Sequence, residues 1–129
     1  MASEKTESIL GIVRSDPRFG PQAYYFIFDA LDFTLTRLGN TRHVTGVELL
    51  RGIRGHAIEQ FGFLARTVLA EWGVHHTQDF GDIVFNLVEA GLLSRSEHDT
   101  RHDFTDVYDF DEAFDRDFRK SLQEVTLGV

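Results

Sequence analysis

Apolar residues recur every three or four positions along five stretches of the chain, which is the spacing of amphipathic α-helices. Local signals mark the ends of several stretches. Pro21 suits the first position of a helix, and Gly39 suits a stop after one. Thr45 followed by Glu48 has the form of a capping box. The pattern therefore predicts helices over residues 3–14, 22–38, 46–61, 63–72 and 79–90.

The stretch 22–38 is predicted to lie at the centre of the core. Its apolar stripe is broadened by the phenylalanines Phe26, Phe28 and Phe33. An apolar face of this width exceeds what one helix contact needs, which leaves homo-oligomerisation through it open.

Glycines interrupt the next stretch. Gly52 and Gly55 each weaken a helix by about 1 kcal/mol relative to alanine, so we expect another backbone to approach closely there. The pattern also breaks near Gly62, where we expect two helices to meet.

The last third of the chain follows a different pattern. Residues 104–110 alternate between aromatic and mostly polar positions, which indicates a strand. A helix, Gly-Leu-Leu, a polar stretch and an aromatic strand follow one another as in the recognition helix and wing of winged-helix domains. The predicted fold class is therefore mainly α with a small β-hairpin, a winged-helix-like core of three helices plus flanking helices.

No linker divides the chain of 129 residues, which predicts a single domain over 1–129. Residues 1–15 are expected to form an N-terminal docking helix or arm, and 96–117 an acidic hairpin or loop. Asp111 can cap a closing helix with one apolar stripe, formed by Phe114, Phe118, Leu122 and Val125.

Charge is concentrated in one place. The net charge is −8, and residues 96–117 contain nine acidic residues against two arginines, a charge of −7. Such a segment repels phosphates and anionic lipids and attracts a basic protein partner; a solubilising face without a partner is the alternative interpretation. The candidate binding surface consists of Glu97, Asp99, Asp103, Asp106, Asp109 and Asp111.

The same charge disfavours duplex DNA binding through this face, because each phosphate contact needs a cation. The stretch 79–90 carries no basic residue. Nucleic-acid binding through the other helices is an alternative, and the candidate residues are Arg42, Arg51, Arg54 and Arg66. These arginines lie beside glutamates, which favours ion pairs on a solvated face.

A second alternative is a metal-dependent enzyme built on the cluster Glu97-His98 and His102-Asp103. Two histidines four positions apart can share a helix face and, with a carboxylate, bind zinc or iron. The candidate metal ligands are His98, His102 and Asp103. No nucleotide-binding, nucleophile-elbow or HExxH motif occurs in the sequence, so we expect no cofactor and assign no catalytic residue.

The remaining composition indicates a soluble, cytoplasmic protein. The chain has no cysteine and no apolar run near the roughly 20 residues of a membrane span. Its first residues are too charged for a signal peptide.

Six short segments in order carry a resemblance to a known family: Asp16–Phe19 (DPRF), His43–Leu50 (HVTGVELL), Phe61–Ala65 (FGFLA), Trp72–Gly73 (WG), Asp79–Glu89 (DFGDIVFNLVE) and Asp106–Phe110 (DVYDF). Over residues 8–115 the chain resembles a small family of uncharacterised proteins catalogued as restricted to Planctomycetes and Verrucomicrobia. The resemblance implies a free-standing bacterial protein with no activity, cofactor or catalytic residue to carry over. The leading hypothesis is a protein-interaction or regulatory module that uses its acidic surface.

Overall fold

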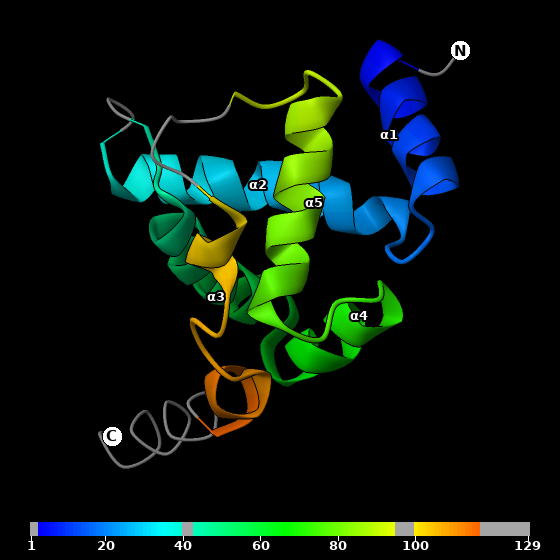
Figure 1. The fold of residues 1–129 in the computed structure, drawn as a ribbon. Helices are drawn as coiled ribbons and strands as arrows, with labels where there is room; N and C mark the ends of the chain where they lie inside the picture. The colour runs from blue at the N-terminus through cyan, green and yellow to red at the C-terminus, as the bar shows by residue number, and fades with distance from the viewer. Residues whose placement is uncertain (1–2, 40–42, 95–99, 117–129) are drawn as a thin grey trace.

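The computed structural model describes residues 3–39, 43–94 and 100–116, and all regular secondary structure among these residues is helical, without a strand (Figure 1). In Figure 1, α5 crosses in front of α2, α3 and α4 lie below, and α1 lies beside the upper half of α5. The elements are α1 (Glu4–Ser15), α2 (Pro21–Arg37), α3 (Gly46–Phe61), the 3₁₀ turn η1 (Gly62–Leu64), α4 (Ala65–Glu71), α5 (Thr77–Glu89), the 3₁₀ turn η2 (Arg101–Phe104) and the π-helical turn η3 (Asp111–Arg116).

The predicted helix ends agree closely with these elements. Pro21 occupies the first turn of α2. At the start of α3 the Thr45 hydroxyl accepts the Glu48 amide at 3.2 Å, and the Glu48 carboxylate accepts the Thr45 amide at 3.0 Å. Gly62, with a φ of 56°, follows α3 and begins the turn η1 that leads into α4, so the predicted meeting of two helices is confirmed.

The predicted β-hairpin is wrong, and with it the winged-helix-like core; the mainly α class is confirmed. Residues 101–104 form η2, and the chain then turns toward η3. Thr77 holds this segment in its non-strand conformation, because its hydroxyl donates to the Phe104 carbonyl at 2.6 Å and accepts from the Val107 amide at 3.1 Å. The alternating phenylalanines Phe104 and Phe110 are buried against helices rather than on one face of a sheet.

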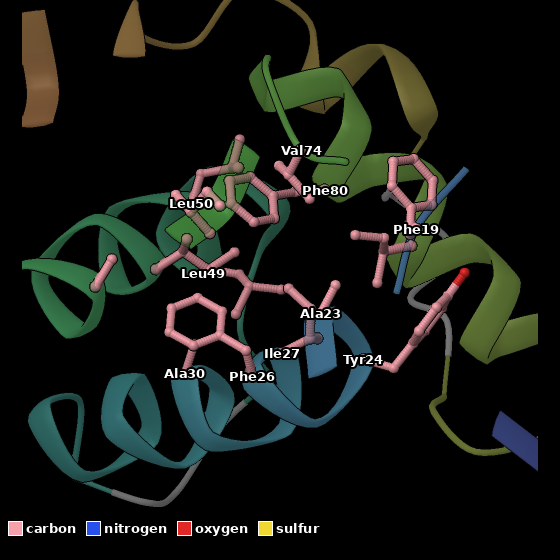
Figure 2. Close-up of a cluster of buried hydrophobic side chains, with 14 of the residues drawn as sticks. Phe19, Ala23, Tyr24, Phe26, Ile27, Ala30, Leu49, Leu50, Val74 and Phe80 are labelled. Atoms are coloured by element: carbon pink, nitrogen blue, oxygen red, sulfur yellow. The ribbon is translucent and has the colours of Figure 1, made fainter. Parts of the chain in front are cut away.

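The core lies where α2, α3 and α5 meet (Figure 2). Figure 2 shows Ile27 of α2, Leu49 and Leu50 of α3, and Phe80 of α5 converging on one layer. The centrality of α2 is confirmed, because it contributes six buried residues to this layer: Ala23, Tyr24, Phe26, Ile27, Ala30 and Thr34. Homo-oligomerisation through α2 stays a prediction.

Glycines on α3 allow α2 to approach closely. A Cβ on Gly52 would lie 1.7 Å from the Thr34 hydroxyl, and one on Gly55 would lie 3.2 Å from the Phe33 ring. Both glycines therefore make room for close packing, but the nearest atoms belong to side chains of α2 rather than to the backbone that the sequence predicted.

The N-terminal segment docks as a helix. Ile9 of α1 is fully buried, and the Thr6 hydroxyl lies 2.7 Å from that of Tyr25 on α2. Every helix in the described ranges is too short or too polar to span a lipid bilayer.

Ion pairs link α5 to the segment that follows α1. Arg18 contacts Asp16 at 2.7 Å and Asp82 at 3.0 Å, and Arg101 contacts Asp82 at 3.3 Å. The Arg18 guanidinium beside Asp16 holds the pKa of that carboxyl well below its usual range, although partial burial opposes the shift. The neighbouring Asn86 amide donates to Asp16 at 3.0 Å and stabilises the same charged form.

Candidate functional site

The acidic segment is predicted to be the binding surface, and the structure divides its carboxylates into three groups. Glu97 and Asp99 lie outside the described residues. The first group consists of Asp103 and Asp109, whose carboxylates stabilise local turns. Asp103 accepts a hydrogen bond from the Thr100 amide at 2.7 Å, and Asp109 accepts one from the Glu112 amide at 3.1 Å.

The second group, Asp111 and Asp115, shares one arginine of α4, which offsets half of its charge. Arg66 forms an ion pair with Asp111 and lies 3.5 Å from Asp115. The third group consists of Asp106 and Glu112, which are exposed and make no side-chain hydrogen bond or ion pair with a described residue. The acidic segment is therefore a mixed surface in which local structure already uses several carboxylates.

A polar cavity of about 310 Å³ opens beside these residues. The exposed His75 and His76 line it together with Asp106 and Asp109. Both histidine amides donate to Asp79, at 2.9 and 3.1 Å, which fixes the turn that leads into α5.

Two aromatic residues, Tyr108 and Phe110, line this polar cavity, and Phe114 packs behind Phe110. Tyr108 stacks on Phe110 with ring centroids 6.1 Å apart, and Phe110 meets the edge of Phe114 at 5.1 Å. The Tyr108 hydroxyl donates to the Leu50 carbonyl at 2.8 Å, and burial raises its pKa. Tyr108 therefore stays protonated near neutral pH and holds structure rather than transferring protons.

The predicted metal site gains no support from this arrangement. His98 and Glu97 lie outside the described residues, His102 is exposed, and Asp103 is engaged by the backbone. Among residues 3–39, 43–94 and 100–116, no three histidine, aspartate or glutamate side chains are grouped to hold a metal ion. The set His98, His102 and Asp103 stays a prediction.

The arginines predicted as a nucleic-acid surface have different surroundings. Arg42 lies outside the described residues, Arg51 is exposed, Arg54 is half-buried, and Arg66 is paired with Asp111. Nucleic-acid binding through these residues stays a prediction.

An exposed apolar pair lies next to the acidic turn. Phe63 is 71% exposed and Leu64 is 48% exposed, both on η1. Turns η1 and η3 are in contact, so this pair adjoins the carboxylates of Asp111–Arg116. We call Phe63, Leu64, Asp106 and the carboxylates of η3 the corner surface. Sequence reasoning missed the apolar pair, because Leu64 continues the helical apolar pattern and a phenylalanine such as Phe63 is most simply assigned to the core.

A second cavity, of about 390 Å³, lies between α2, α3 and α5 and is mainly apolar. Its walls come from segments far apart in the chain, and most of its apolar wall residues follow an ordinary core pattern. The sequence therefore holds no local signal for this cavity.

Comparison of the chain with protein families, with curated proteins and with solved structures gives no match. The resemblance to a family restricted to Planctomycetes and Verrucomicrobia accordingly stays a prediction.

Proposed function

We propose that this chain is a protein-interaction module that binds a basic, partly apolar segment of another protein at the corner surface. The observation that carries the proposal is the 71% exposure of Phe63 beside a half-exposed Leu64, next to the acidic turn η3. Burying one such aromatic side chain in an interface is worth about 1.5–3 kcal/mol.

The exposed pair supplies the anchor. Aromatic side chains are enriched among the residues that dominate binding energy, and contiguous exposed apolar patches are typical of interaction sites. Trp72 and Phe61, which belong to the same helical corner, are by contrast packed against the core. The exposure is therefore local to Phe63 and Leu64 and suits a small docking contact.

The carboxylates around the exposed pair favour a partner that carries lysine or arginine. Asp111 and Asp115 already hold the guanidinium of Arg66, which demonstrates that this turn accommodates an arginine. Asp106 and Glu112 leave two further carboxylates for a partner's lysine or arginine. Charges at the edge of an interface raise association rate and selectivity more than affinity.

Affinity capture at low and moderate salt tests the proposal. Wild-type protein is expected to retain a partner that moderate salt releases. The double variant Phe63→Ser/Leu64→Ser is expected to bind that partner about tenfold more weakly, because truncating an aromatic anchor costs more than about 1 kcal/mol. The variant Asp106→Asn/Glu112→Gln is expected to weaken the salt dependence.

Leu10 supplies the matched control, because it is 39% exposed on α1, away from the corner surface. Leu10→Ser should leave capture unchanged. Recovery of no salt-sensitive partner, or equal recovery with Phe63→Ser/Leu64→Ser, would overturn the proposal.

A further inference from the structure

The apolar cavity between α2, α3 and α5 has the size and lining of a ligand pocket. Its volume of about 390 Å³ lies near the small end of the range of about 300–1,000 Å³ for small-molecule sites. Four of its lining side chains are buried: Val44, Leu49, Phe85 and Phe104.

The wall at Phe104 is held in place by packing on two helices. A Cβ added to Gly46 of α3 would lie 3.1 Å from the Phe104 ring, and one on Gly81 of α5 would lie 2.8 Å from the Phe104 Cβ. The Phe104 ring also meets the edge of Phe85, with centroids 6.4 Å apart. Because the Thr77 hydroxyl fixes the Phe104 carbonyl, this wall is preformed rather than assembled by a ligand.

Polarity changes from the interior of the cavity to its edge. The half-buried Leu31, Leu35 and Val88 line its sides, whereas the exposed Thr45, His43 and Ser94 are its polar lining residues. A ligand that matches this lining has an apolar body and a polar end. Val88 is half-buried and is not among the partly buried side chains that pack on the core.

We propose that this cavity binds a small amphiphile, with a hydrocarbon chain against Val44, Leu49 and Phe104 and a polar head group at Thr45 and Ser94. Burial of the chain supplies the affinity, and the hydroxyl groups at the edge orient the head. The site shares no residue with the corner surface, so it stands independently of the proposed interaction.

Titration with dodecanoate and with dodecanol, each below its aggregation limit, tests this site. We expect saturable binding with one molecule per chain, and a rise in thermal midpoint with ligand concentration. Backbone amide NMR shifts are expected at Val44–Leu49 and Val84–Val88. Binding of both ligands assigns an uncharged polar head, and binding of dodecanoate alone assigns a carboxylate.

The variant Val88→Phe fills the cavity from its side and is expected to weaken binding about tenfold or more. Val68→Phe is the matched control, since Val68 is a half-buried valine of α4 outside the cavity. Phe63→Ser/Leu64→Ser should also leave ligand binding unchanged. Circular dichroism checks that each variant is folded, and the NMR shifts of wild-type protein test the site without any variant. Absence of saturable binding, shifts confined to other residues, or equal weakening by both valine variants would overturn the proposal.

Discussion

Gly52 of α3 lies directly against Thr34 of α2, and the space for a side chain at this position is already filled. The Thr34 hydroxyl donates to the Ala30 carbonyl at 2.7 Å, so it cannot rotate away without losing that bond. We therefore expect Gly52→Ala to lower the free energy of unfolding by about 1–3 kcal/mol, measured by chemical denaturation.

Gly11 provides the control for this substitution. It lies inside α1, and a Cβ there would have no atom within 4 Å. Gly11→Ala should raise the free energy of unfolding by up to about 1 kcal/mol, because only helix propensity changes. Equal effects of the two substitutions would contradict the close contact between α2 and α3.

Tyr108 links the segment after η2 to α3 through its hydroxyl. Tyr108→Phe removes the bond to the Leu50 carbonyl and is expected to cost about 1 kcal/mol at neutral pH. Burial raises the pKa of this phenol above its ordinary 10.0, so the folded state favours the neutral form. The wild-type protein should therefore lose stability as the pH rises above 10.0, and Tyr108→Phe should lose less. Denaturation at neutral and alkaline pH measures both effects; equal alkaline losses would exclude this role.

At the scale of elements, the position of α1 depends on its apolar face and on the ion pairs that follow it. The pKa of Asp16 is depressed in the folded state. Its contribution to the free energy of unfolding is therefore complete when the pH is above the ordinary pKa of 3.8, and this contribution is lost as the pH falls below that value. Asp16→Asn should lower stability by about 1 kcal/mol at neutral pH, since a charged hydrogen bond is lost at a partly exposed site.

Denaturation curves between neutral pH and about pH 2 check this expectation. The stability difference between wild type and Asp16→Asn should shrink in the acid range. Asp32→Asn is the control, because Asp32 is exposed on α2. A difference that stays constant with pH would show that the Asp16 charge has no part in docking α1.

At the scale of the whole molecule, Phe104 joins three helical segments. It is 2% exposed, packs on Gly46 and Gly81, and its backbone is bound by Thr77. Phe104→Ala should lower the free energy of unfolding by about 3–5 kcal/mol, because a large cavity opens between α3 and α5. Phe63→Ala is the same chemical change at an exposed position, and its free energy of unfolding should remain within about 0.5 kcal/mol of the wild-type value. Thermal and chemical denaturation distinguish the two.

The acidic segment shows which features of the whole molecule composition can predict and which it cannot. The sequence predicts a strongly negative surface, but it does not predict which carboxylates remain available to a partner. Arg66 lies far from Asp111 in sequence and neutralises it in the fold. Leu64 continues the helical apolar pattern of the sequence, which by itself favours burial, yet both Phe63 and Leu64 are exposed in the turn that begins at Gly62.

The sequence by itself determined the helices, because helical periodicity, the proline at the start of α2 and the capping box of α3 act over a few neighbouring residues. It did not determine the structure of residues 104–110, since alternating aromatic residues suit a strand as well as an irregular segment packed on helices. Only the tertiary structure decided between them, through the Thr77 hydroxyl that binds both Phe104 and Val107. The apolar cavity and the corner surface arise in the same way, because their residues meet only after distant segments have packed.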